Sequence, residues 1–410
     1  MIAIWEDKES SDAQRRWALR TLVITAGLPV LPSADRGSAQ LYIYDAVATR
    51  VLPDDILAQV SRGAGCVAIG SEQRVLERTG SGFVFWTGQD ELAITARGLL
   101  LQGHNQSEYL PSSDLREVLA DLQEQPPVNR ALTSLVDACQ QVANSLDMYL
   151  PIIAKWPGAQ SYAACLTHDV DRIGHKGVLS AGRIGLRAAR DALTGRWRVG
   201  TRQVQRILAA NLVGVEQDPY DNFEQYQQLE AEYKAYSAFF LLVGHHFRRH
   251  GASYRLNDYL LSRIEPLAED GWEIGLHGSY YGWKDAAIIR AEKETLESFV
   301  GQPVIGGRQH YLHWQQPQTW HVYRQAGLRY DSSVGYRNSA GYRTHFTFPY
   351  RPFDQGQGME VDLWELPLAI MDTAVFGALG LDGEAVWQVC DALVRLVAQS
   401  HHGLLTVLWH

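Results

Sequence analysis

Residues 163–171 read AACLTHDVD, and this stretch decides the fold. An apolar run of strand length ends in two aspartates, Asp169 and Asp171. Alternation along an extended segment puts both carboxylates on the same side of it. Carboxylates at this spacing repel one another unless a cation or a proton lies between them. We therefore expect a chemical site where this strand ends; a turn or helix cap built from aspartate is the structural alternative.

Further apolar runs follow this strand and alternate with helical patterns. The expected strands are residues 237–244, 272–278, 303–308, 328–333 and 404–410. Helical patterns over 222–236 and 285–300 separate some of them. Such alternation favours parallel strands joined by crossover helices. In barrels of this kind the chemistry collects at the carboxyl ends of the strands.

A smaller α/β pattern precedes this region. Its expected elements are strands at 41–46 and 65–70, a hairpin over 83–101, and helices at 11–27, 112–123 and 131–150. A stretch with proline and glycine follows the last helix. We therefore expect an N-terminal domain over 1–150 and a catalytic domain over 151–410. The first of these carries no cluster of histidines, cysteines or paired carboxylates, so the sequence assigns it no role.

The composition excludes several classes of protein. The chain has 410 residues, of which 46% are hydrophobic, and its 12 Trp, 19 Tyr and 11 Phe are too many for a disordered chain. Its four cysteines are scattered, which indicates a reducing compartment. The net charge of −9 argues against general nucleic-acid binding. Without a long apolar run or a signal-peptide pattern, the sequence predicts a cytoplasmic protein.

One segment departs from the acidic total. The insertion over 172–221 is basic and amphipathic, with nine Lys and Arg residues but one acidic residue between Arg172 and Arg206. A solvated helical face is the ordinary interpretation. The alternative is a dock for an anionic carrier, or a peripheral contact with the inner membrane. Because the segment follows Asp171, we expect it at the rim of the site, with any binding weakened by salt.

Three more strand ends carry residues suited to catalysis. They are GLHGSYY (275–281) with His277, GGRQHY (306–311) with Arg308 and His310, and VLWH (407–410) with His410. An arginine can hold a carboxylate in a fixed orientation through paired hydrogen bonds. A strand that ends in histidine can aim an imidazole at a central site. Each motif alone also fits a structural histidine, a stacking loop or a frayed end.

Taken together and in this order, the four segments resemble the polysaccharide deacetylase family, also called the NodB-homology or carbohydrate esterase 4 group. THDVD resembles the first motif in its D-x-D variant, and the other three resemble the metal-histidine, arginine and late histidine motifs. The resemblance covers about residues 160–410. It implies an α/β fold, a distorted (β/α) barrel that is typically seven-stranded, here preceded by the smaller domain.

The resemblance also implies roles for single residues. The catalytic set comprises Asp169 as general base, Arg308 as its orienting partner, His410 as general acid and Asp331 as a further orienting group. The substrate-binding candidates are Tyr280, Tyr311, Tyr342, Arg343, Tyr350 and Arg351. Asp171 and His277 are the implied metal ligands.

Two positions depart from the family pattern. Tyr281 stands where the metal motif has its second histidine, and His310 stands where the arginine motif has proline. We expect His310 to replace the missing ligand. One carboxylate and two imidazoles would then hold a single divalent ion, zinc first, with cobalt, manganese or nickel as alternatives.

The resemblance thus predicts a metal-dependent amidohydrolase that removes an N-acetyl group from an amino sugar in an oligosaccharide or glycoconjugate. The alternative is a catalytically inactive carbohydrate-binding protein on the same barrel, which Tyr281 favours. A barrel glycosidase using Asp169 and Glu365 as its carboxylate pair leaves the histidines unexplained. The sequence predicts neither the sugar and its linkage nor the oligomeric state.

Overall fold

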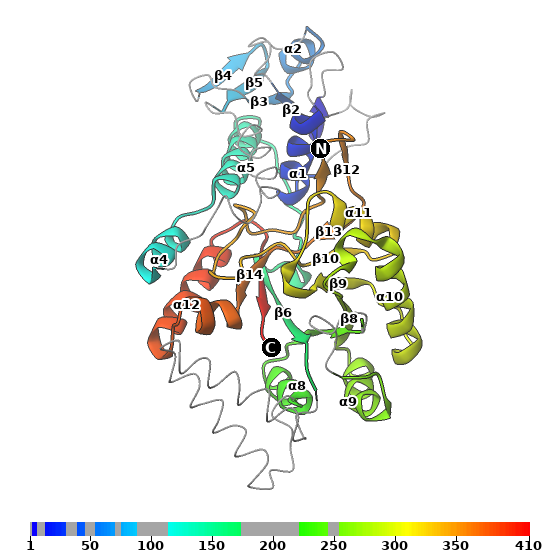
Figure 1. The fold of residues 1–410 in the computed structure, drawn as a ribbon. Coiled ribbons are helices and arrows are strands. Elements are labelled where there is room, and N and C mark those ends of the chain that lie inside the picture. Colours follow the sequence, from blue (N-terminus) through cyan, green and yellow to red (C-terminus); the bar gives the residue numbers. More distant parts are fainter. Residues whose placement is uncertain are drawn as a thin grey trace.

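The computed structural model describes residues 2–5, 13–29, 39–45, 54–69, 75–87, 114–173, 221–244 and 254–410 (Figure 1). Nearly all of the basic insertion, and the second half of the hairpin expected over 83–101, lie outside these residues. Within them, no helix is both long enough and apolar enough to cross a membrane.

The N-terminal region forms a five-stranded sheet in the order β1-β2-β3-β5-β4. Its strands are β1 (Ile2–Trp5), β2 (Leu41–Asp45), β3 (Gly65–Ile69), β4 (Val75–Thr79) and β5 (Gly82–Trp86), and only β4 runs antiparallel to its neighbour. The helices are α1 (Ala13–Thr25), α2 (Asp54–Ser61), α4 (Leu115–Gln123) and α5 (Pro127–Ser145). The expected strands at 41–46 and 65–70 and the three expected helices are present. The last helix begins and ends several residues earlier than its pattern predicted.

The second sheet has eight strands in the order β13-β10-β9-β8-β7-β6-β15-β14, and every pair in it is parallel. The strands are β6 (Tyr162–Val170), β7 (Ala238–Leu242), β8 (Glu273–Gly278), β9 (Gly306–Gln309), β10 (Tyr330–Asp331), β13 (Trp364–Glu365), β14 (Leu368–Met371) and β15 (Gly403–Leu408). Six of the eight match the apolar runs of the sequence. A separate short ribbon pairs β11 (Phe353–Asp354) with β12 (Met359–Glu360).

The two edges of this sheet meet. β13 and β14 lie at opposite edges, but only Leu366 and Pro367 separate them in the chain. A link of two residues spans only about 10 Å, so the sheet must curl until its edges are adjacent. Counted as one bent strand, β13 and β14 complete a seven-membered barrel. The structure thus confirms the expected distorted (β/α) barrel behind a smaller α/β domain.

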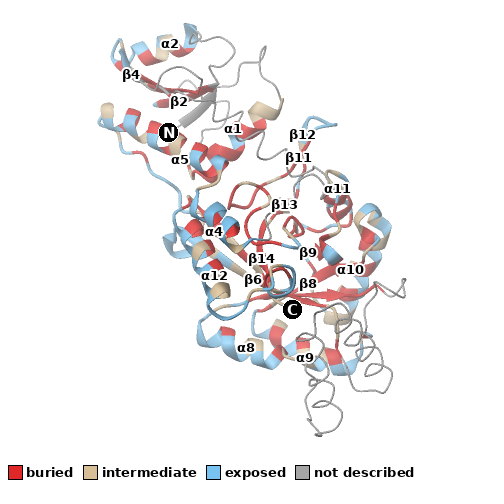
Figure 2. Cartoon of the chain, turned by 60° about the vertical axis from the view of Figure 1, so that its left-hand side comes forward, coloured by how far each residue is buried: buried red, intermediate tan, exposed pale blue. Residues whose placement is uncertain are grey.

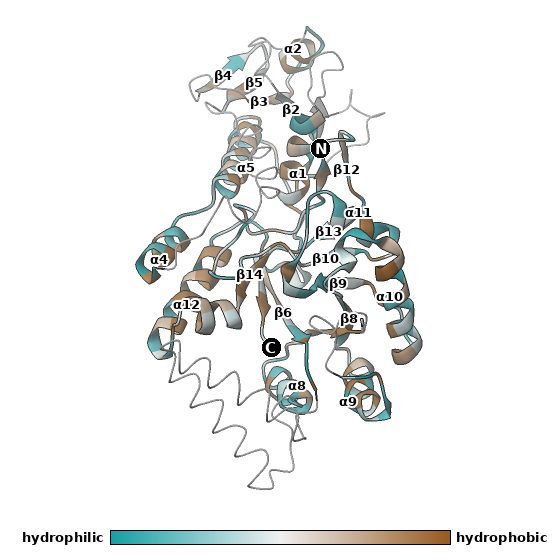
Figure 3. Ribbon diagram, viewed as in Figure 1, coloured by the Kyte–Doolittle hydropathy of each residue, from teal (hydrophilic) through white to brown (hydrophobic). Residues whose placement is uncertain are grey.

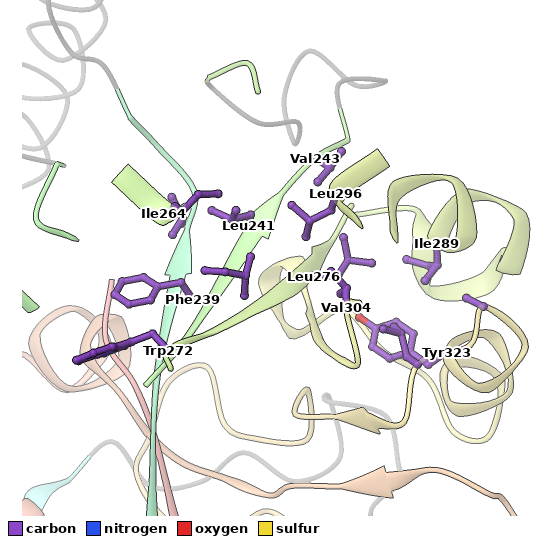
Figure 4. Close-up of a cluster of buried hydrophobic side chains, with 14 of the residues drawn as sticks. Phe239, Leu241, Val243, Ile264, Trp272, Leu276, Ile289, Leu296, Val304 and Tyr323 are labelled. Atoms are coloured by element: carbon purple, nitrogen blue, oxygen red, sulfur yellow. The ribbon is translucent and has the colours of Figure 1, made fainter. Parts of the chain in front are cut away.

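Helices cover the outside of the barrel. They are α8 (Phe223–Glu232), α9 (Asp258–Glu269), α10 (Ala286–Val300), α11 (Gln318–Gln325) and α12 (Gly383–Ala398). Figure 4 shows Leu241 of β7 and Leu276 of β8 packing among Ile264 of α9 and Leu296 of α10, which are all buried. Most residues of the barrel strands are buried, whereas α8 exposes much of its surface (Figure 2), and that helix is largely hydrophilic (Figure 3).

The N-terminal domain packs at the amino ends of the barrel strands. Trp17 of α1 and Phe348 of the barrel belong to one apolar core. Asn129 of α5 donates a hydrogen bond to Thr347 Oγ1 and accepts one from the Thr347 amide. The Thr347 carbonyl in turn accepts from Leu404, at the start of β15. The carboxyl ends of the strands therefore face away from this domain (Figure 1).

Candidate active site

Three side chains from three strand ends form one cluster of potential metal ligands. Asp171 follows β6, His277 lies in β8 and His310 follows β9. Asp171 Oδ1 lies 3.3 Å from His277 Nε2 and 3.4 Å from His310 Nε2. The three ligand atoms all lie within 4.8 Å of one another, and among the described residues this is the group suited to hold a metal ion. We call Asp171, His277 and His310 the metal cluster.

The hydrogen bonds of the cluster favour metal binding. His277 Nδ1 lies 3.0 Å from the Arg308 carbonyl, which can only accept. Nδ1 therefore carries a proton, and in the neutral ring the Nε2 lone pair faces the cluster. His310 reaches the cluster because the chain leaves β9 in a tight turn, in which Tyr311 has a φ of 61°. Such left-handed backbone at a non-glycine residue is strained and is often found at functional sites.

Electrostatics also suit the metal cluster to a cation. Burial raises the pKa of Asp171, but hydrogen bonds from His277 and His310 outweigh this and hold that pKa well below its usual range. Burial lowers the pKa of His277, and the carboxylates of Asp169 and Asp171 reverse this and raise it. The electrostatics of the metal cluster thus favour a positive charge between Asp171, His277 and His310. One carboxylate and two imidazoles are a donor set that fits a zinc-like ion with open positions for water or substrate.

Asp169 is held by a buried arginine. Arg308 Nη1 donates to Asp169 Oδ1 at 2.9 Å and to Thr167 Oγ1 at 2.8 Å. Its remaining nitrogens donate to Ser332, Nε to the carbonyl at 2.8 Å and Nη2 to the hydroxyl at 2.9 Å. The guanidinium, fully buried, also lies over the ring of Phe240. Arg308 therefore fixes one oxygen of Asp169 and leaves the other 3.7 Å from His277 Nδ1.

His410 is held by a second carboxylate, Asp372. The His410 ring donates from Nδ1 to Asp372 Oδ1 at 2.7 Å, and its amide donates to Oδ2 at 3.1 Å. Burial lowers the pKa of His410, but Asp372, Asp169 and Asp171 outweigh burial and raise it to about 9. Burial raises the pKa of Asp169, but His277, Arg308 and His410 outweigh burial and lower that pKa. At neutral pH the imidazole of His410 is thus protonated and the carboxyl of Asp169 is ionised.

Asp372 is the partner of His410, which the sequence did not predict. The resemblance implied Asp331 as the extra orienting group, whereas the structure places Asp372 against His410. The signal was available, because Asp372 directly follows the apolar run of β14. That position is the kind of strand end that identified the other site residues.

Asp331 lies elsewhere, beside Glu365. The two residues are opposite one another on β10 and β13, and both are fully buried. Asp331 accepts a hydrogen bond from Ser333, and Glu365 accepts from Trp320 Nε1 at 2.8 Å and from the Val334 amide at 3.0 Å. Burial raises the pKa of Asp331 to about 7 and that of Glu365 well above its usual range. Burial thus favours the protonated form of these two carboxyl groups, and Glu365 is too enclosed to serve as the glycosidase carboxylate opposite Asp169.

Two of the predicted substrate-binding residues lie beside the metal cluster. The ring of Tyr311 stacks on His310 with 4.3 Å between centroids, and the ring of Tyr280 lies 5.8 Å from that of Tyr311. Tyr311 is 48% exposed. The guanidinium of Arg343 lies over the ring of Trp314, at 5.3 Å from its centroid.

The other three substrate-binding candidates are not at the mouth of the site. Tyr342 is buried and donates to the Leu404 carbonyl, at the amino end of β15. Tyr350 is buried in the core shared with the N-terminal domain, and Arg351 forms an ion pair with Asp362. The structure does not bring these three residues of the expected sugar-facing loop to the metal cluster. The aromatic side chains of the loop are buried against the N-terminal domain, at the opposite end of the barrel.

Comparisons with known proteins place polysaccharide deacetylases among the structural neighbours at low identity. A polysaccharide deacetylase structure from Mycobacterium smegmatis is 19% identical over 62% of this chain and 79% of its own, with a TM-score of 0.36. A second, from Pseudomonas aeruginosa PAO1, is 15% identical over 64% and 82%, with a TM-score of 0.40. A mutant of a CE4 family pseudoenzyme with restored enzymatic activity is 8% identical over 62% and 58%, with a TM-score of 0.30.

No protein-family model matches the sequence, and no curated protein matches it significantly. Since the TM-scores above are below 0.5, we assign the fold from the strand topology of the chain itself.

Proposed function

We propose that the chain is a metal-dependent hydrolase that removes an N-acetyl group from an amino sugar in an oligosaccharide or glycoconjugate. One observation carries the proposal. The Arg308–Asp169 pair, the metal cluster and the Asp372–His410 pair converge at the carboxyl ends of the barrel strands. A base, an acid and a set of metal ligands are together what hydrolysis of an amide requires.

The residues divide the reaction between them. A divalent ion in the metal cluster would supply Lewis-acid polarisation of the acetamide carbonyl and a lowered pKa for water. Asp169, ionised and oriented by Arg308, accepts a proton from the attacking water. His410, protonated, gives a proton to the amine nitrogen as its bond to the acyl carbon breaks. Water and an acetamide are thereby converted into acetate and an amine.

The identity of the metal, the contact with the sugar, an anionic carrier and the cellular location belong to the same proposal. Zinc suits the donor set, and cobalt, manganese and nickel accept the same ligands. The exposed ring of Tyr311 beside His310 gives a sugar ring a face to stack on. A substrate on an anionic carrier would meet the basic segment after Asp171, which lies outside the described residues. Action in the cytoplasm, with peripheral contact to the inner membrane, stays an expectation from the sequence.

Acetate release from a panel of N-acetylated glycans by the metal-loaded protein tests the proposal. Asp169→Asn should keep the shape of the site and its metal but lower the rate about 10²- to 10⁴-fold, because the amide accepts no proton at neutral pH. Asp391→Asn, an exposed aspartate on α12, is the matched control. Glycan binding without acetate release by the wild type would favour the carbohydrate-binding alternative. Wild-type turnover by Asp169→Asn would refute the role of Asp169.

A further inference from the structure

Strand β6 presents His168 to the side opposite Asp169, since neighbouring residues of a strand alternate. The His168 ring is buried, with its centroid 4.0 Å from that of Tyr226 on α8 and 4.8 Å from that of Phe239 on β7. His168 therefore lies behind the site and not in it. Any effect of His168 on the reaction must therefore be transmitted through another residue.

Both ring nitrogens of His168 face acceptors. Nδ1 lies 2.8 Å from the carbonyl oxygen of Trp409, and Nε2 lies 2.9 Å from Oε1 of Glu230. The other oxygen of Glu230 accepts from Trp272 Nε1 at 2.5 Å. Burial raises the pKa of Glu230, but the hydrogen bonds from His168, Trp272 and Ser237 outweigh burial and lower it. A backbone carbonyl can only accept, so Nδ1 of His168 donates to Trp409, while Nε2 is paired with the Glu230 carboxyl group.

The residue that His168 holds is the one before His410. The Trp409 amide donates to the Thr167 carbonyl at 3.0 Å, while its own carbonyl accepts from His168. This peptide is therefore fixed from both sides just beyond the end of β15. The hydroxyl of Tyr226, which packs on His168, donates to the His410 carbonyl at 3.1 Å. Residues beyond the end of a strand fray unless they are tied down in this way.

We propose that His168 and Glu230 form a buried hydrogen-bonded pair that positions His410, by fixing the carbonyl of Trp409. The inference rests on the proposed function and adds positioning residues to it. Misplacement of a catalytic group by about 1 Å can cost about 10²-fold in rate. His168 and Glu230 thus determine the position of the His410 imidazole, and Asp372 favours its protonated form.

Two isosteric substitutions separate this role from simple packing. The amide of His168→Asn can take the place of Nδ1 and keep the donor to Trp409. The longer amide of His168→Gln reaches the place of Nε2, so this variant loses the hydrogen bond to the Trp409 carbonyl. His168→Gln should lower kcat about 10²-fold with KM and metal content unchanged, whereas His168→Asn should retain most of the rate. Equal losses in the two variants would overturn the proposal.

A readout without substrate completes the test. In histidine-labelled, full-length protein, the Nδ1–H resonance of His410, assigned by its absence in His410→Gln, should vanish in His168→Gln and persist in His168→Asn. His321→Gln, which breaks a histidine–carboxylate pair with Asp354 elsewhere, is the control. A wild-type His410 resonance in His168→Gln would refute the inference.

The inference can still be tested if a variant fails to fold or if the wild type is inactive. If His168→Gln does not fold, Glu230→Gln and Glu230→Leu replace it. Gln can donate to a neutral His168 and keep the Trp409 contact, so it should preserve the His410 resonance, whereas Leu should abolish it. Identical spectra for these two variants would contradict the inference. If the wild type releases no acetate, the proposed function fails, and the resonance of His410 still decides this inference on its own.

Discussion

The acid and the base of the proposed reaction owe their protonation states to different partners. Arg308 and two histidines keep the pKa of Asp169 low in spite of burial. Asp372 is foremost among the carboxylates that raise the pKa of His410 to about 9. Both residues are therefore in their working forms over the range between these two values, which predicts a bell-shaped pH dependence.

Asp372→Asn tests this assignment at the level of one residue. The amide can still accept a hydrogen bond from His410, but it carries no charge to favour the imidazolium. Because a raised pKa keeps the acid protonated until the pH passes it, the alkaline limb of kcat/KM should fall near pH 9 in the wild type and at lower pH in Asp372→Asn. Asp354→Asn, beside His321, serves as the control. An unchanged limb in Asp372→Asn would show that another group limits the rate at high pH.

At the scale of elements, the strand ends were the predictable part of the site. Short apolar stretches located β6, β8, β9 and β15, and the polar residues at their ends indicated the chemistry. β13 has only two residues, and β14 follows it after Leu366 and Pro367, so no local pattern marks how the barrel closes. Nor does a loop sequence show at which end of a barrel it packs, so it did not predict where Tyr350 and Arg351 lie.

The approach of strands β9 and β10 depends on Gly306. A Cβ at this position would lie 1.8 Å from Cζ of Tyr330, whose hydroxyl donates to Glu273 at 2.7 Å. Gly306→Ala should therefore lower the free energy of unfolding by about 1–3 kcal/mol, as overpacking does. Gly377→Ala, where a Cβ meets nothing within 4 Å, should leave it unchanged. Urea unfolding compares them, and equal midpoints would mean that β9 can shift freely.

The carboxyl pair on β10 and β13 predicts a pH effect on stability. Burial raises the pKa of Asp331 to about 7, above the value near 4 of an unfolded chain. The folded state then holds a proton that the unfolded state releases, so stability falls as pH rises between these values. Asp331→Asn cannot titrate and should remove a fall on the order of a few kcal/mol.

Urea midpoints at pH 5 and pH 8 measure this effect. The wild type and the surface control Asp391→Asn should lose stability between the two values, relative to Asp331→Asn. If all three proteins change alike, the pKa of Asp331 is not raised in the folded state.

At the scale of the whole molecule, the N-terminal domain and the site lie at opposite ends of the barrel. The domain shares a core with Phe346, Phe348 and Phe353, all beyond the boundary that the sequence suggested. It contacts the amino ends of the strands, and the metal cluster lies at their carboxyl ends. Among the described residues, the N-terminal domain therefore packs against the barrel at the end away from the metal cluster.

The central claim is that Asp171, His277 and His310 together hold one divalent ion. Calorimetric titration of the metal-free, full-length chain with zinc tests it most directly. We predict one ion per chain for the wild type and for Tyr281→Phe, and binding weakened by at least about tenfold in His310→Ala, since loss of a ligand costs no less than loss of an outer partner. One ion bound by His310→Ala with wild-type affinity would contradict the account.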